Sequence, residues 1–102
     1  MTNNQQIRVA DNAAAHRYEI FVGERVVGFV TYRLTPDNRL VLTHTEIDEA
    51  HEGQGLGRHL AASTLDDARR RGLSVTPVCP FIAAYMRRNP EYADLLDAAH
   101  RH

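Results

Sequence analysis

Hydrophobic and polar residues alternate along the first half of the chain, which is the pattern of half-buried β-strands. The alternation predicts four strands, at residues 7–11, 17–22, 25–34 and 39–47. Gly23 marks a tight turn between the second and third strands, because glycine adopts the positive φ that such hairpin turns require. The sequence Pro36-Asp37-Asn38 marks the next turn. We therefore expect an antiparallel meander.

Side chains of the fourth predicted strand divide between two faces, because successive residues of a strand point to opposite sides. A regular alternation gives one face two leucines followed by two ionisable residues, namely Leu40, Leu42, His44 and Glu46. It gives the other face Val41, Thr43, Thr45 and Ile47.

The second half of the chain changes to helical spacing. Gly53, Gly55 and Gly57 precede apolar residues that recur at helical intervals up to residue 68, and Gly72 predicts the end of this helix. Residues 73–78 predict a strand parallel to the fourth, and residues 80–88 and 92–99 predict two further helices. The expected fold is α/β (α+β), with a compact, mixed and largely antiparallel sheet in the order ββββ-α-β-α.

Length and composition indicate one globular domain without a strong overall charge. Of the 102 residues, 43% are hydrophobic and 25% are charged, as in ordinary globular proteins. We expect a single domain over residues 1–102, with its core at about residues 7–96 and flexible ends. The formal net charge is -1, so no overall field favours nucleic acid or a membrane surface as a partner.

Several features bear on the compartment. No apolar segment is long enough to span a bilayer, and residues 1–6 lack the apolar core of a signal peptide. The single cysteine, Cys79, cannot form an intramolecular disulfide and fits a reducing compartment. We therefore predict a cytoplasmic protein. His100 and His102 have neither a third ligand nor metal-binding spacing, so no metal site is expected.

The junction between the fourth strand and the first helix is a candidate phosphate site. Its glycines let the backbone approach a ligand closely, and the free N–H groups at the start of a helix carry partial positive charge. The junction is not a P-loop, because no lysine followed by serine or threonine stands at the required place. It is not a dinucleotide-binding motif either, because the glycine spacing differs and a meander precedes it.

From about residue 7 to residue 96, the chain resembles the GNAT acetyltransferase superfamily, in particular its short, stand-alone N-acetyltransferase domains. Three ordered blocks carry the resemblance: His-Thr-Glu-Ile at 44–47, Glu-Gly-Gln-Gly-Leu-Gly at 52–57 and Pro-Val-Cys-Pro-Phe-Ile-Ala-Ala-Tyr at 77–85. Larger members usually place two helices between their first two strands and commonly use them to bind the acceptor. Only residues 12–15 separate those strands here.

The resemblance implies acetyl-CoA, or another acyl-coenzyme A, as the cosubstrate. Backbone amides at 53–57 would hold its pyrophosphate, and its pantetheine would run between the fourth and fifth strands. The residues expected to contact it are Glu46, Ile47, Asp48, Gly53, Gln54, Gly55, Leu56, Gly57 and Arg58.

Glu52 departs from the superfamily pattern, which usually has arginine or glutamine at this position. A carboxylate about 4 Å from a phosphate charge is repelled by about 1 kcal/mol in water, and by more where solvent is excluded. Arg58, or Arg87 and Arg88 across the cleft, is the candidate source of the missing positive charge.

Acetyl transfer to an amine requires an acceptor for the amine proton and a proton for the leaving thiolate. Glu46 is the first candidate base if partial burial raises its pKa, and His44 is the alternative base. By the resemblance, Tyr85 stands where the superfamily often has a tyrosine that protonates the coenzyme A sulfur. The competing interpretations are that Glu46 is an ordinary carboxylate at a strand end, that His44 is a packed core or interface histidine, and that Tyr85 is a core tyrosine.

Cys79 directly follows the fifth predicted strand, just before a helix start that would lower the pKa of its thiol. It is therefore a candidate nucleophile or acetyl-carrying residue, and a buried inert thiol is the alternative. The asparagine that is frequent near this point in the superfamily is absent.

These observations predict an acyl-coenzyme A-dependent N-acetyltransferase, acting as a monomer or weak homodimer. The acceptor would be an amine of a small molecule or a polypeptide. One alternative is a coenzyme A-binding module with little catalysis, which Glu52 and the missing acceptor helices favour. The other is acetyl or thiol chemistry carried by Cys79.

Overall fold

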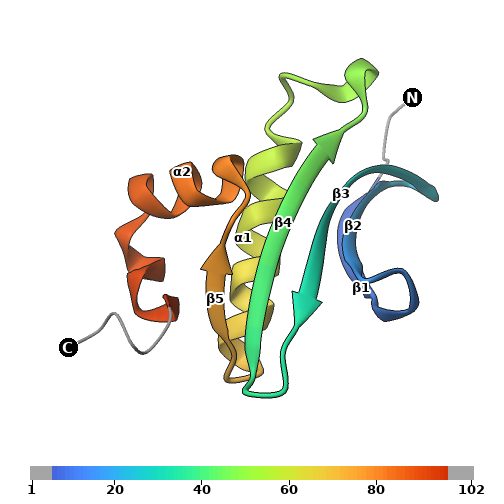
Figure 1. Cartoon of the computed structure of the whole chain (residues 1–102). Helices are drawn as coiled ribbons and strands as arrows, with labels where there is room; N and C mark the ends of the chain where they lie inside the picture. Colours follow the sequence, from blue (N-terminus) through green and yellow to red (C-terminus); the bar gives the residue numbers. More distant parts are fainter. Residues whose placement is uncertain (1–5, 97–102) are drawn as a thin grey trace.

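The computed structural model describes residues 6–96, and five strands form one sheet within it. The strands are β1 (Ile7–Asn12), β2 (Arg17–Val22), β3 (Arg25–Leu34), β4 (Arg39–Ile47) and β5 (Ser74–Pro77). They lie side by side in sequence order (Figure 1). The first four pair antiparallel and β5 pairs parallel to β4, as the sequence predicts.

Two α-helices follow the meander, α1 (Leu56–Arg70) and α2 (Pro80–Arg88). Three 3-10 helices complete the described chain, namely η1 (Ala13–Ala15), η2 (Glu49–His51) and η3 (Pro90–Leu95). The last of these takes the place of the helix predicted at 92–99, whose final residues lie outside the described range with the predicted flexible ends and the two terminal histidines. Only η1 connects β1 to β2, so the fold lacks the two helices of larger superfamily members, as expected.

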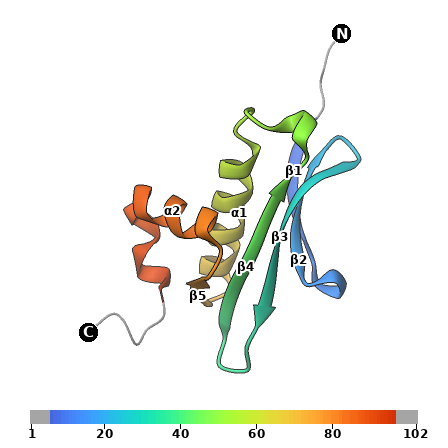
Figure 2. The same ribbon diagram turned by 45° about the horizontal axis from the view of Figure 1, so that its top comes forward.

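Helix α1 runs along one face of the sheet, and α2 lies beside it past the β5 edge (Figures 1 and 2). The core fills the space between α1 and the strands, where Leu60, Leu65, Val30 and Leu42 are fully buried. Gly72 ends α1 with a φ of +72°, and the amide of Leu73 donates to the carbonyl of Ala68. This is the glycine-dependent helix end that the sequence predicts.

The opposite face of the sheet is not covered by a helix within residues 6–96, and we call it the open face. Cross-strand pairing places on it the outward side chains Arg17, Glu19, Phe29, Thr31, His44 and Glu46. Glu46 lies across from Phe29, and His44 lies across from Thr31. The guanidinium of Arg17 lies 4.4 Å from the centre of the Phe29 ring.

The predicted faces of β4 are wrong beyond Leu42. Thr31 pairs with His44 but the next residue, Tyr32, pairs with Leu42, so Thr43 is an extra residue in β4. Such a β-bulge resets the alternation of side chains. Leu40 and Leu42 face α1 as predicted, whereas His44 and Glu46 lie on the open face and not on the leucine face.

A polar cluster ties α1 to the first strands. The Tyr18 hydroxyl donates to Asp67 at 2.5 Å, the Tyr32 hydroxyl donates to Asp11 at 2.6 Å, and Arg71 donates to both aspartates. Burial and the neighbouring carboxylates raise the pKa of Tyr18 well above its ordinary value and that of Tyr32 to about 12. Burial alone would raise the pKa of Asp67, but hydrogen bonds from Tyr18 and Arg71 lower it.

Within residues 6–96, no helix is both long and apolar enough to cross a lipid bilayer.

Candidate active site

The start of α1 presents backbone donors that no side chain caps. Gly53 and Gly55 have φ values of +84° and +78°, which explains the choice of glycine at both positions. Gly55 is the N-cap residue, it makes no side-chain cap hydrogen bond, and the first turn of α1 contains no acidic residue. The first N–H groups of the helix are therefore available to an anionic ligand.

These donors open into a cavity of about 400 Å³, which we call the helix cavity. Its lining residues are Ile47, His51, Glu52, Gly53, Gly55, Leu56, Gly57, Arg58 and Phe81. The lining thus includes six of the nine residues predicted to contact the cofactor, together with the apolar side chain of Phe81. Gln54 is exposed and does not line it.

Phe81 is a residue of this cavity that the sequence did not identify. A Cβ at Gly57 would lie 2.9 Å from the end of the Phe81 ring, so the absence of a side chain at Gly57 lets α2 pack against the start of α1. The signal available in the sequence was only an apolar residue near the beginning of a helix.

Arg58 places a positive charge beside the start of α1. Its Nη2 lies 3.0 Å from the position that a Cβ of Gly55 would occupy, so the guanidinium folds back over the start of α1. Glu52 lines the same cavity. The cavity therefore contains both Glu52, whose negative charge would repel a phosphate, and Arg58, whose positive charge would offset that repulsion.

Pairing between β4 and β5 ends before β4 reaches the helix cavity at Ile47. Their paired residues end at Leu42 and Pro77, and the amide of Cys79 still donates to the carbonyl of Leu42 at 2.9 Å. Beyond this point the Cys79 sulfur lies 3.2 Å from the Thr45 hydroxyl. Cys79 is 3% exposed, as in the interpretation of a buried thiol. Its chemical role remains a prediction.

The two candidate bases meet on the open face. The His44 Nε2 lies 2.9 Å from a carboxylate oxygen of Glu46, so each can exchange a proton with the other. Their side chains are 59% and 61% exposed, so the partial burial proposed for Glu46 is not present.

Tyr85 lies on α2, half-buried, with its ring centre 6.0 Å from that of Tyr92. Burial, together with the nearby Glu91 and Asp66 carboxylates, raises the pKa of its hydroxyl. The side chain therefore holds its proton at neutral pH, as a proton donor must before it acts.

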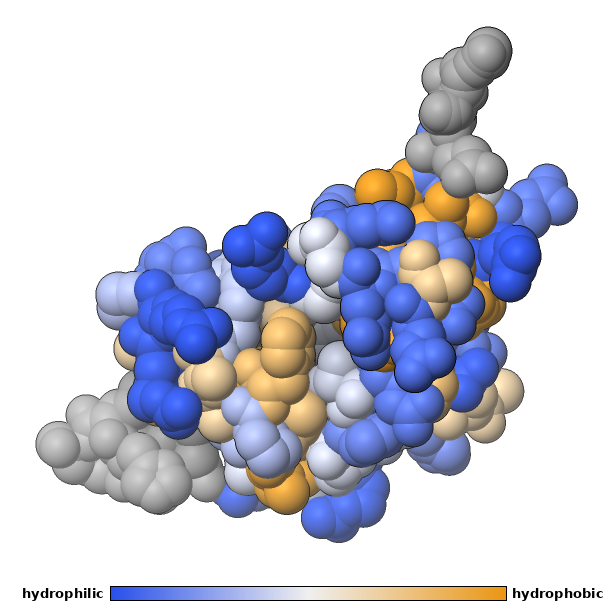
Figure 3. Space-filling view, turned by 90° about the horizontal axis from the view of Figure 1, so that it is seen from above, coloured by the Kyte–Doolittle hydropathy of each residue, from blue (hydrophilic) through white to orange (hydrophobic). Residues whose placement is uncertain are grey.

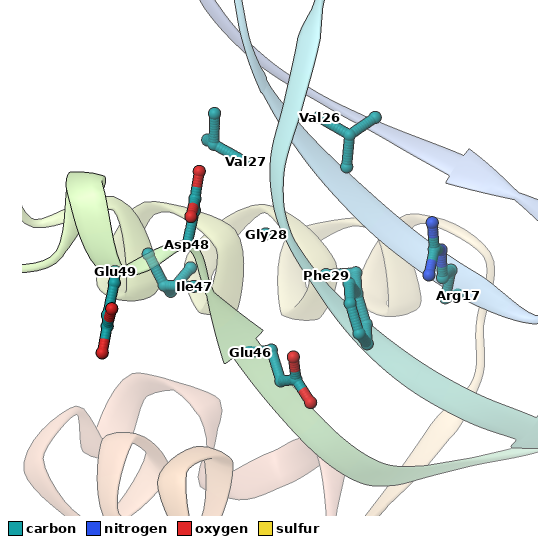
Figure 4. Close-up of a pocket in the computed structure, with 9 residues that line it drawn as sticks. All are labelled: Arg17, Val26, Val27, Gly28, Phe29, Glu46, Ile47, Asp48 and Glu49. Atoms are coloured by element: carbon teal, nitrogen blue, oxygen red, sulfur yellow. The ribbon is translucent and has the colours of Figure 1, made fainter.

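A second cavity of about 580 Å³ lies at the end of β4, and we call it the strand cavity (Figure 4). It is lined by Arg17, Val26, Val27, Gly28, Phe29, Glu46, Ile47, Asp48 and Glu49. Ile47 lines both cavities, so they are neighbours on either side of one strand end. The sequence identified Glu46, Ile47 and Asp48 at this position but gave no signal for Arg17 and Phe29, which only the sheet pairing brings there.

The comparisons with known proteins can be set against this geometry. Residues 17–95 match the model of the GCN5-related N-acetyltransferase family. The chain belongs to this family. The resemblance seen in the sequence is thereby confirmed, and members of the family generally use acetyl-CoA.

Relatives in animals match over part of the chain. Protein NATD1 of Gallus gallus and that of Mus musculus are each 31% identical over 70 residues, covering 69% of this chain and 52% of each relative. The chain thus matches about half the length of these two proteins. Protein NATD1 of Xenopus tropicalis is 26% identical over 93 residues, covering 88% of this chain and 84% of the relative.

Solved structures share the fold. A GCN5-like protein from Staphylococcus aureus aligns with a TM-score of 0.66 and 24% identity, over 99% of both chains. The ribosomal-protein-S18-alanine N-acetyltransferase of Escherichia coli aligns with a TM-score of 0.55 and 21% identity, over 72% of this chain and 44% of that one. The predicted mixed, largely antiparallel sheet is confirmed by both likenesses.

Proposed function

We propose that this protein binds acetyl-CoA at the start of α1 and transfers the acetyl group to an amine. The observation that carries the proposal is the uncapped start of α1, which opens into a cavity lined by Ile47 of β4, a strand whose pairing with β5 has already ended at Leu42. The residues present fit the cosubstrate: free backbone donors and Arg58 suit its diphosphate, and Leu56 and Phe81 suit its apolar parts.

The cosubstrate supplies a thioester, which an amine attacks with loss of the thiol. Amides at the start of α1 would bind the diphosphate, and the β4 backbone at 46–48 would pair with the pantetheine. This would lead the thioester toward the separation of β4 and β5, where Thr45 and Cys79 lie. Binding in a fixed orientation lowers the barrier to transfer by itself.

Proton movement is assigned to the residues that the geometry offers. The amine loses a proton to His44, or to Glu46, which lies within hydrogen-bond distance of it. The leaving thiolate gains a proton from Tyr85, which is protonated at neutral pH. In the net reaction, the acetyl group moves from the coenzyme A sulfur to the amine nitrogen, and one proton moves from the amine to the sulfur. This exchange involves no change of oxidation state.

The first test is calorimetry with coenzyme A and with pantetheine, which lacks the diphosphate and the 3′-phosphoadenosine attached to it. We expect coenzyme A to bind and pantetheine to bind at least about a hundredfold more weakly, because loss of several charge-assisted hydrogen bonds amounts to about 3 kcal/mol or more. Equal affinity for the two compounds would overturn the assignment of the diphosphate to α1. Mass-detected acetylation of an amine panel then tests transfer.

A coenzyme A-binding module with little catalysis is the second candidate, and Glu52 in the helix cavity favours it. It predicts binding of acetyl-CoA without acetylation of any amine. The third possibility from the sequence, transfer through Cys79, predicts a mass increase of the protein by one acetyl group that disappears in Cys79→Ser. Absence of this adduct together with undiminished turnover in Cys79→Ser would exclude the cysteine route.

A further inference from the structure

We infer that the strand cavity selects an acceptor amine that carries a second positive charge. This inference rests on the proposed function, because it assigns the acceptor to the cavity on the far side of Ile47 from the helix cavity. The two substrates would then meet at the end of β4, each from its own side of the strand.

The charges around the strand cavity are unequal. Three carboxylates line it, those of Glu46, Asp48 and Glu49, and one cationic side chain does, that of Arg17. Arg17 is already paired, because its Nε lies 2.8 Å from a carboxylate oxygen of Glu19, outside the cavity lining. The lining therefore keeps an excess of negative charge toward a ligand.

Two histidines contact these carboxylates from outside the cavity lining. His44 contacts Glu46 at 2.9 Å, and the His51 Nδ1 lies 3.6 Å from a carboxylate oxygen of Asp48.

Phe29 gives the cavity a second means of binding a cation. It lies directly across the sheet from Glu46, and its ring already supports the guanidinium of Arg17. An aromatic ring beside carboxylates suits an alkylammonium group, whose methylene carbons pack on the ring while its charge meets the carboxylates.

The positions of the carboxylates suggest how two charges would be placed. Glu46 is a candidate base, so the reacting amine belongs beside it. Asp48 follows two residues later, about 7 Å along an extended chain, and Glu49 comes next. Figure 4 shows the carboxylates of these three residues spread along the cavity and not gathered at one point. A short diamine, or a lysine side chain next to another cationic residue, matches this spread.

The experiment compares acceptors that differ only in the second charge. Putrescine and n-butylamine have the same carbon chain, and two peptides with norleucine or lysine after a reactive lysine give the same contrast in a polypeptide. We expect kcat/KM to favour the doubly charged member of at least one pair about tenfold, after correction for the two equivalent amines of putrescine, and to lose much of this preference at high salt. The preferred pair identifies the source of the amine. No preference in either pair overturns the inference.

A double variant connects the preference to the cavity. Asp48→Asn with Glu49→Gln removes two carboxylates and should reduce the preference about fivefold, which corresponds to about 1 kcal/mol. Asp37→Asn removes one exposed carboxylate in the turn at the other end of β4 and should leave the preference unchanged. Equal effects of the two changes would contradict the placement.

Direct binding separates this inference from the proposed function. Amide chemical shifts of residues 26–29 and 46–49 should move when putrescine is added without acetyl-CoA, and should move less with n-butylamine. Binding of putrescine without acetylation of any amine would support the cation-selective cavity and overturn the transferase. Acetylation of amines with no preference for a second charge and no binding of putrescine would support the transferase and overturn the cation-selective cavity.

Discussion

Gly28 is the position where a single methyl group should disturb both cavities. A Cβ at this residue would lie 2.5 Å from Cδ1 of Ile47, 2.8 Å from the carbonyl oxygen of Glu46 and 3.1 Å from Cγ2 of Ile20. One of these contacts is with backbone, which cannot rotate away as a side chain can. Because Ile47 lines both cavities, any movement of it changes both.

The expected magnitude follows from two opposing effects. Forcing a methyl group into a packed site destabilises by about 1–3 kcal/mol. Replacing glycine by alanine restricts the unfolded chain and returns about 0.4–1 kcal/mol. We therefore expect Gly28→Ala to lower the free energy of unfolding by about 1–2 kcal/mol, measured by urea denaturation followed by circular dichroism. The melting temperature should fall by roughly 4–16 °C.

The matched variant is Ile47→Val, which removes the carbon atom nearest to the added methyl group. In a double-mutant cycle, the combined variant should be more stable than the sum of the single changes predicts, because the valine makes room for the alanine. Coenzyme A affinity should fall in Gly28→Ala and recover in part in the combined variant. A Gly28→Ala protein as stable as the original, or strictly additive changes, would refute this account of the close contact.

Four further predictions concern Asp67 and Tyr32 of the polar cluster, Arg58 and Cys79. Asp67→Asn should lower stability at neutral pH and weaken its acid dependence: the folded-state pKa of Asp67 is lowered, so its contribution is present above the ordinary carboxyl pKa and is lost as pH falls through the folded value. Tyr32→Phe should make the free energy of unfolding fall less steeply at alkaline pH. The contribution of Tyr32 is full below the ordinary tyrosine pKa of about 10 and is lost as pH rises toward about 12. For both variants, a pH profile of unfolding identical to that of the original protein would contradict the prediction. Arg58→Gln should weaken coenzyme A binding about tenfold in calorimetry, or about 1.4 kcal/mol, and reduce its salt dependence, whereas Arg33→Gln, on the exposed part of β3, should change neither. Cys79 should react with a thiol reagent at least about a hundredfold more slowly in the native protein than in urea, and equal rates would show that the thiol is not buried.

The sequence predicted those features that local chemistry determines. The strand order follows from alternation and turn residues, and the end of α1 follows from Gly72. The glycine-led start of α1 follows from residues 53 and 55, which both have positive φ values, whereas its binding of an anion stays a prediction. Each of these depends on a few neighbouring residues, so a single sequence is enough to show it.

The features that were wrong or missing depend on contacts between distant residues. The bulge at Thr43 arises from the pairing of β4 with β3, and nothing in the local alternation marks it. It moves His44 and Glu46 to the open face. Phe81 and Phe29 belong to cavities only because α2 packs on Gly57 and because β3 pairs with β4. Their hydrophobic character alone predicts a core residue.

The most direct test of the central claim is titration of the isotopically labelled protein with coenzyme A, followed by backbone amide chemical shifts. The account predicts that coenzyme A causes the largest changes at residues 53–58 and a second set of changes at residues 46–48 on β4. Pantetheine should cause smaller changes than coenzyme A at residues 53–58, and similar changes at residues 46–48. Changes confined to other parts of the chain, or equal changes with pantetheine at 53–58, would contradict the binding of a diphosphate by the start of α1.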